Sequence, residues 1–266
     1  MNPVAWLIVA AAVAGLLAGR LVVVTAAWLP ETGGGSAAAA PRLPPRRCPH
    51  PAAVTWPAAG LVPLSGWRGL RARCPDCAAR LGAWCLPAEL LTAAVLAVLA
   101  ARLGPVPALP AYCYLGVAGV ALAVIDARYK RLPDALTLPS YPVALVLLGA
   151  AALGAPDGGR RFLTALIGLA AAWLFFVLQA LIYPAGIGWG DVKLSGLLGL
   201  YLGWLGLGTL VTGLVLGYVL AAVAGLALLA ARRATRRSQV PFGPFLLAGT
   251  LAAIVISGLG HPVLTL

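Results

Sequence analysis

The chain has 266 residues, of which 62% are hydrophobic and only 10% carry a charged side chain, and its mean hydropathy is +0.97. Soluble globular domains are about half apolar and about one quarter charged, so this composition excludes an ordinary water-soluble protein. The net charge of +12 could indicate nucleic-acid binding. No interleaving of aromatic and basic residues accompanies the charge, however, and we therefore expect no nucleic-acid partner.

Long uncharged apolar runs predict an all-α fold, a polytopic membrane bundle of about eight transmembrane helices. A helix needs about 20 apolar residues to cross the hydrocarbon core of a bilayer. A run of small and apolar residues near 203–208, rich in glycine, is expected to separate two short crossings. The expected spans are residues 4–28, 87–103, 103–125, 135–156 and 162–190, two crossings within 194–231, and 238–266.

The apolar runs divide the chain into three parts. Residues 1–28 form the first transmembrane helix, 29–86 a small cytoplasmic loop domain with a linker-like start, and 87–266 a seven-helix membrane domain that carries the candidate site. Because the first 19 residues contain no Lys or Arg, they lack the basic region of a cleavable signal peptide, and we expect this helix to be retained. Gly15 and Gly19 are spaced for close packing against another helix.

The basic residues predict the orientation. Most of the 19 Lys and Arg residues fall in alternate loops, and basic loops stay on the cytoplasmic side of a membrane. We therefore expect a multi-pass protein of the inner or plasma membrane with both termini outside. The cytoplasmic loops would contact anionic lipid headgroups. They contain the basic residues of segments 42–80, 128–131 and 232–237, together with Lys193.

Two aspartates, Asp126 and Asp191, stand at the ends of apolar runs, where a carboxylate is costly and is a functional candidate. Because 135–156 and 162–185 are expected to cross the membrane in opposite directions, both aspartates would lie at the same face. Two carboxylates in a low-dielectric site share one proton. Such a pair can activate a water molecule and protonate a peptide carbonyl, which is aspartic peptidase chemistry. With only two histidines in the chain, Ser-His and Cys-His pairs are poorly supplied.

Glycines beside Asp191 favour a binding role. Because Gly188 and Gly190 lack a Cβ atom, an extended peptide could approach the carboxylate, and we expect both of them and Lys193 to bind the substrate. The alternative is that this Gly-Trp-Gly-Asp segment is only an interhelical turn in which Asp191 caps the next helix. Asp134 directly precedes an apolar run, and we expect it to be a helix N-cap outside the pair.

Four ordered segments carry a family resemblance. They are Pro87-Ala88-Glu89-Leu90, Ile125-Asp126-Ala127-Arg128 with residues 132–139, residues 186–194, and Val240-Pro241-Phe242-Gly243-Pro244-Phe245. They resemble motifs of the type IV prepilin leader peptidases, membrane aspartic peptidases with a Gly-x-Gly-Asp motif. The resemblance implies removal of a basic leader from prepilin or pseudopilin-like substrates at the cytoplasmic membrane edge. It also implies that Asp126 and Asp191 are catalytic and that cleavage needs no cofactor.

Members of that family often carry two Cys-x-x-Cys pairs in the first cytoplasmic loop, a pattern that suits tetrahedral zinc. Here Cys74 and Cys77 form one pair, whereas Pro51 stands where Cys48 would have its partner. We favour unpaired thiols over zinc held by Cys48, Cys74 and Cys77 with His50 or Cys85. Some relatives also methylate the new amino terminus. No glycine-rich nucleotide motif is visible, so S-adenosylmethionine is expected only if methylation is retained.

A proton- or ion-coupled membrane transporter is the alternative from another functional class, because intramembrane carboxylates also serve ion relays. A transporter would place its carboxylates near the middle of the bilayer and would favour an internal repeat. A peptidase would place them at one membrane edge beside glycine-rich backbone, which is the pattern that the sequence has.

Overall fold

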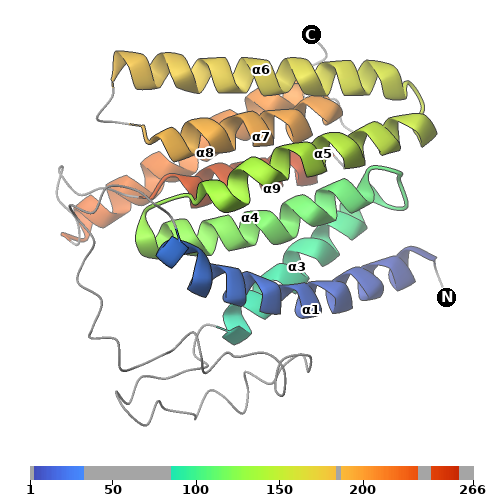
Figure 1. Ribbon diagram of the computed structural model, residues 1–266, viewed down its shortest axis with the longest axis horizontal. Coiled ribbons are helices and arrows are strands. Elements are labelled where there is room, and N and C mark those ends of the chain that lie inside the picture. Colours follow the sequence, from blue (N-terminus) through green and yellow to red (C-terminus); the bar gives the residue numbers. More distant parts are fainter. Residues whose placement is uncertain (1–2, 33–84, 184–186, 233–240, 258–266) are drawn as a thin grey trace.

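The computed structural model describes residues 3–32, 85–183, 187–232 and 241–257, with side chains of the first helix described to Gly19. These ranges form eight helices and contain no β-strand, which confirms the all-α class (Figure 1). The helices are α1 (Pro3–Thr32), α3 (Cys85–Leu103), α4 (Leu109–Tyr129), α5 (Asp134–Gly154), α6 (Gly158–Ile182), α7 (Trp189–Leu205), α8 (Leu207–Ala230) and α9 (Gly243–Ser257).

Five of these helices are long and apolar enough to cross a membrane, namely α3, α4, α5, α6 and α8. By contrast, α7 has 17 residues and α9 has 15, which is less than the about 20 that a simple crossing needs. The chain is therefore a multi-pass membrane protein, whereas the expected number of about eight spanning helices is not confirmed. The expected loop domain at 29–86 lies almost entirely outside the described residues.

Two helix boundaries show what the sequence pattern did and did not predict. The break expected near 203–208 falls at Gly206, between α7 and α8. Its backbone has φ of +130°, a conformation that other residues rarely adopt, and its amide donates to the carbonyl of Leu202 at 3.1 Å. The first helix, in contrast, continues past its expected end at residue 28 to Thr32.

The helix α7 lies inside the bundle, and twelve of its 17 residues are buried. It packs closely against α6 because glycines line the contact (Figure 1). A Cβ atom on Gly199 would overlap the carbonyl oxygen of Gly168, and one on Gly203 would lie 2.5 Å from the carbonyl oxygen of Thr164. Small residues at such contacts let two helix backbones approach each other. This contact fixes the helix whose first turn carries Asp191.

The same kind of contact joins α1 to α3. A Cβ atom on Gly15 would lie 2.5 Å from the Cα of Ala93, and one on Gly19 would lie 2.5 Å from the Cα of Glu89. The expected close packing at these two glycines is therefore confirmed. The side chain of Glu89 is fully buried beside this contact.

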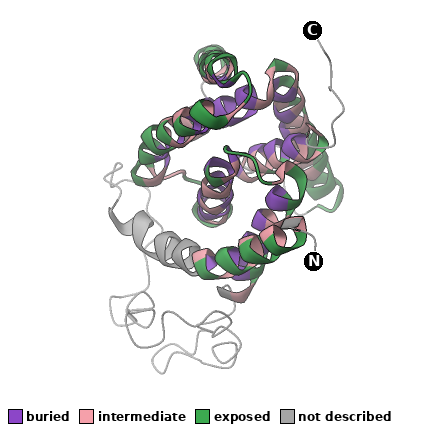
Figure 2. Cartoon of the chain, turned by 90° about the vertical axis from the view of Figure 1, so that its right-hand side faces the viewer, coloured by how far each residue is buried: buried purple, intermediate pink, exposed green. Residues whose placement is uncertain are grey.

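Buried faces point toward the middle of the bundle and exposed faces point outward (Figure 2). Many exposed side chains are large and apolar. The helix α8 is the clearest case, since only four of its 24 residues are buried. On this helix Val211, Val215, Val219 and Val223 are all about half exposed or more. In water such a surface would be a large exposed apolar patch, whereas in a bilayer it contacts lipid.

The α6–α7 contact predicts a contrast between two glycine substitutions. Gly199→Ala should lower the stability of the detergent-solubilised protein by about 1–3 kcal/mol, because the new methyl group overlaps backbone. Gly225→Ala on α8 meets open space and should be neutral or stabilise by about 0.5–1 kcal/mol, since alanine favours helix. Thermal unfolding followed by circular dichroism measures both, and equal effects would contradict the close contact.

Candidate active site

Asp126 lies one turn before the end of α4 and is 5% exposed. Its Oδ2 atom accepts a hydrogen bond from the backbone amide of Gly243, the first residue of α9, at 3.0 Å. The helix ends directly afterwards, because Lys130 adopts a left-handed conformation with φ of 52° and its amide donates to the carbonyl of Asp126 at 2.8 Å. The Asp126 carboxylate therefore lies where the end of α4 meets the start of α9.

Asp191 lies in the first turn of α7 and is partly buried. Gly188 is the N-cap residue of this helix, and no side chain makes a capping hydrogen bond. Asp191 is therefore not the N-cap residue itself, although its carboxylate makes a hydrogen bond with the backbone of Gly188. An acidic side chain in the first turn is favoured by the helix dipole, which stabilises its ionised form.

Asp126 and Asp191 line the same pocket, which has a volume of about 440 Å³. Residues from three segments enclose it, namely the end of α4, the connection to α5 and the start of α7. The remaining lining residues are Lys130, Arg131, Leu132, Gly188 and Gly190. The two aspartates, which are distant in sequence, therefore face one solvent-accessible cavity at one end of the bundle.

The surroundings of Asp191 leave its carboxyl group partly protonated at neutral pH. Asp191 lies outside the five candidate spans, and burial together with the negative charge of Asp126 raises the pKa of Asp191 to about 7. A hydrogen bond with the backbone of Gly188 opposes this shift. At neutral pH Asp191 is therefore protonated in part of the molecules, as expected for two acidic groups that share one proton.

The two glycines beside Asp191 have different surroundings. Gly188 has extended backbone angles that any residue can adopt, and a Cβ atom there would make an ordinary contact, 3.5 Å from Oδ2 of Asp191. Gly190 has less room, because a Cβ atom would lie 2.9 Å from the Cβ of Leu132. Gly190 thus lets α7 pack against the connection between α4 and α5, and both glycines leave one side of the pocket open.

Lys193 and Asp134 form an ion pair with 2.7 Å between Nζ and Oδ1. The N-cap prediction for Asp134 is wrong, because Pro133 is the N-cap of α5 and Asp134 is the first helical residue. Lys193 is not among the residues that line the pocket. Because both side chains are partly exposed, the pair contributes about 0–1 kcal/mol. A hydrogen bond from the Tyr141 hydroxyl to the carbonyl of Lys193 adds a second link between α5 and α7.

Three contributors to the site were not predicted from the sequence, namely the Gly243 amide, Lys130 and Arg131. The role of the Gly243 amide could not be predicted, because nearly every residue has a backbone amide. The Pro-Phe-Gly-Pro segment that contains Gly243 was nevertheless recognised as a motif. Lys130 and Arg131 were interpreted as orientation signals only. Their position directly after the helix that carries Asp126 was the available signal for a place in the pocket.

The candidate zinc ligands Cys48, Cys74, Cys77 and His50 lie outside the described residues, as does the side chain of Cys85. Within the part of the chain that the structure describes, no three His, Cys, Asp or Glu side chains come together as a metal site. The charged side chains that line the described pocket are two carboxylates and two basic groups.

Residues 113–255 match the type IV leader peptidase family. Proteins named prepilin leader peptidase/N-methyltransferase are among the similar sequences. That of Aeromonas salmonicida is 35% identical over 212 residues, which cover 78% of this chain and 69% of that protein. That of Burkholderia pseudomallei is 36% identical over 226 residues (80% and 67%), and that of Bacillus subtilis is 28% identical over 211 residues (79% and 81%). No solved structure gives a significant match.

The shared pocket predicts coupled titration. Infrared difference spectra of the protein should show a carboxyl group that loses its proton near pH 7 and that is absent in Asp191→Asn. In Asp126→Asn the pKa of Asp191 should fall, because the neighbouring negative charge that raises it is gone. An unchanged Asp191 titration in Asp126→Asn would show that the two carboxylates do not interact.

Proposed function

Because this chain belongs to the type IV leader peptidase family, we propose that Asp126 and Asp191 are the catalytic pair of an aspartic endopeptidase that removes leader peptides from prepilin-like proteins. The observation that carries the proposal is the pocket that both carboxylates line at one end of an apolar bundle. The printed names of the relatives supply the substrate class, and the pocket supplies the chemistry.

The environments of the two carboxylates assign their roles. The negative charge of Asp126 is one of the causes that raise the pKa of Asp191, so Asp126, whose Oδ2 atom accepts from the Gly243 amide, is the ionised member of the pair and the general base. Asp191, whose pKa is raised to about 7, holds the shared proton and is the general acid. At neutral pH Asp191 is protonated in part of the molecules, and in these molecules both groups can act.

The reaction follows from these roles. Asp126 takes a proton from a water molecule as the water oxygen attacks the carbonyl carbon of the scissile bond, while Asp191 gives its proton to the carbonyl oxygen. The resulting tetrahedral diol collapses when Asp126 passes its proton to the leaving nitrogen. The C–N bond then breaks, and Asp191 recovers a proton from the diol. Both carboxylates return to their starting states, so cleavage requires no cofactor.

The basic residues support a cytoplasmic position for this pocket. Lys130 and Arg131 line it, and they belong to one of the basic loops that the positive-inside pattern places on the cytoplasmic side. With that orientation the protein lies in the inner or plasma membrane with both termini outside. Anionic lipid headgroups are partners of the same loops.

Other parts of the chain have different roles in this proposal. Gly188 and Gly190 border the space through which an extended substrate backbone reaches Asp191. Lys193 forms an ion pair with Asp134, and we assign it to the junction of α5 and α7.

The methyl transfer that the relatives' names include would use S-adenosylmethionine, and we do not assign it to this pocket, whose residues are those of a hydrolase.

Asp126→Asn and Asp191→Asn should each abolish leader removal from a co-expressed prepilin. Because the two groups act as one unit, each single change should cost nearly as much as the double change. The measurement is the ratio of leader-bearing to mature prepilin on an immunoblot. Asp134→Asn is the matched control, since Asp134 is an aspartate near the same membrane edge that makes a partly exposed ion pair, and this variant should process normally.

Normal processing by either Asp126→Asn or Asp191→Asn would overturn the catalytic pair. The transporter alternative makes a different prediction, because a transporter would leave the prepilin uncut in every variant and in the wild-type protein. Leader removal by the wild-type protein therefore separates the two functional classes.

Gly243→Ala should lower kcat about 100-fold with little change in KM. A Cβ atom there would lie 2.7 Å from Oδ2 of Asp126, so the carboxylate must leave the position in which the amide holds it. The control is Gly159→Ala at the start of α6, where a Cβ atom meets nothing within 4 Å. Wild-type kcat in a folded Gly243→Ala protein would show that this amide does not position Asp126.

A further inference from the structure

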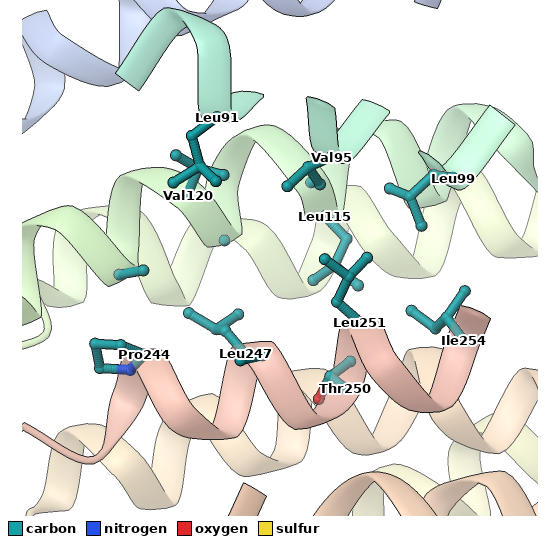
Figure 3. A pocket seen from close by; sticks show the side chains of 14 residues that line it. Leu91, Val95, Leu99, Leu115, Val120, Pro244, Leu247, Thr250, Leu251 and Ile254 are labelled. Carbon is teal, nitrogen blue, oxygen red and sulfur yellow. The ribbon is translucent and has the colours of Figure 1, made fainter. Parts of the chain in front are cut away.

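An apolar groove lies between α3, α4 and α9, separate from the polar pocket (Figure 3). Its volume is about 180 Å³, and among the described residues that line it Thr250 is the only polar one. The side chains of α3 and α4 form one wall and those of α9 form the other (Figure 3). The labelled lining residues include Leu91 and Val95 on α3, Leu115 on α4, and Leu247, Leu251 and Ile254 on α9.

Two glycines on α4 keep this groove open. Gly116 and Gly119 lie one turn apart, so they share a face of the helix. A Cβ atom on Gly116 would lie 3.2 Å from side-chain atoms of Val95 and Leu99, and one on Gly119 would lie 3.1 Å from Leu247. Larger residues at these two positions would bring side chains into the space between the walls. The groove is therefore a consequence of the sequence of α4.

The groove ends beside the catalytic residues. Ala123, which lines it, lies one turn before Asp126 on α4, and Pro244, which also lines it, directly follows Gly243. From this end the groove follows α4 toward Leu115, which lies near the middle of a candidate membrane span. The polar pocket and the apolar groove are thus neighbours along α4 and at the start of α9.

We propose that this groove binds the apolar segment of the substrate polypeptide that adjoins the scissile bond. This inference rests on the proposed function. A polypeptide with its scissile bond at Asp126 and Asp191 must leave the pocket on both sides. The polar pocket is lined by the basic residues Lys130 and Arg131, and the groove begins one turn along α4 from Asp126, at Ala123. Because the groove is apolar and lies along a candidate span, the segment that enters it is apolar and lies within the membrane.

The size of the groove defines what it recognises. A volume of about 180 Å³ is below the ~300 Å³ of the smallest usual ligand pockets, so it cannot enclose a whole helix. It accepts apolar side chains from one face of a helix that lies against α4 and α9. The groove thus selects substrates by the apolar face next to the cleavage site, while the carboxylates perform the chemistry on any peptide bond presented to them.

The test uses Ala248→Phe, because Ala248 is an exposed alanine on the rim of the groove. The phenyl ring would occupy the space for the substrate side chains. The KM for a full-length prepilin should rise about ten-fold or more with little change in kcat, since at least one apolar side chain loses its burial site. Cleavage of a short peptide that spans the scissile bond but lacks the apolar segment should be unchanged.

The matched control is Ala222→Phe, which adds the same ring to an exposed alanine on α8, away from the groove. It should leave both substrates unaffected. A second measurement avoids any change to the groove. A prepilin with a benzophenone side chain in its apolar segment is irradiated with the Asp191→Asn protein, and the cross-linked residues are mapped by mass spectrometry. Adducts should lie within 91–99 of α3, 115–123 of α4 or 244–254 of α9.

The outcomes separate this inference from the proposed function. Wild-type KM in Ala248→Phe, or adducts confined to α8, would overturn the groove proposal even if Asp191→Asn is inactive. Adducts to lipid alone would show that an acyl chain, and not the substrate, fills the groove. Normal leader removal by Asp191→Asn would overturn the catalytic assignment itself.

Discussion

The hydrogen bond from the Gly243 amide to Asp126 is the interaction on which the site depends. A carboxylate near the end of an apolar helix is costly unless a donor satisfies it, and here the donor is the first residue of another helix. To supply it, α9 must begin where α4 ends, and this placement also puts Leu247 opposite Gly119 of α4. The position of Asp126 and the shape of the apolar groove therefore have a common origin.

The second carboxylate depends on packing rather than on a single hydrogen bond. Asp191 is in the first turn of α7, and α7 is held inside the bundle by glycine contacts with α6. At its start Gly190 lies against Leu132, which follows the helix that carries Asp126. The polar pocket is thus formed at one end of a bundle whose interior is packed tightly. The carboxylates line a polar pocket at that end, while apolar contacts lie along the helices.

Much of this could be predicted from the sequence. Hydropathy alone indicated the helices, and glycine marked the break at Gly206. The expectation that Asp126 and Asp191 meet came from counting membrane crossings, which requires no knowledge of packing. The number of spanning helices could not be predicted in the same way, because α7 and α9 are apolar but short. The assignment of Asp134 as an N-cap failed because Pro133 takes that position and because Lys193, its partner, is distant in sequence. The role of Gly243 could not be predicted either, since a backbone donor cannot be recognised from a pattern of side chains.

The most direct test of the account measures whether positions 126 and 191 face each other across one cavity. A variant with Asp126→Cys and Asp191→Cys, in which the five native cysteines are replaced, is treated in membranes with a short bifunctional thiol reagent. The shared pocket predicts an intramolecular cross-link between the two new cysteines, seen by mass spectrometry as one peptide that joins the end of α4 to the start of α7. If each thiol reacts singly with the reagent and no cross-link forms, the two positions do not share a site and the account is wrong.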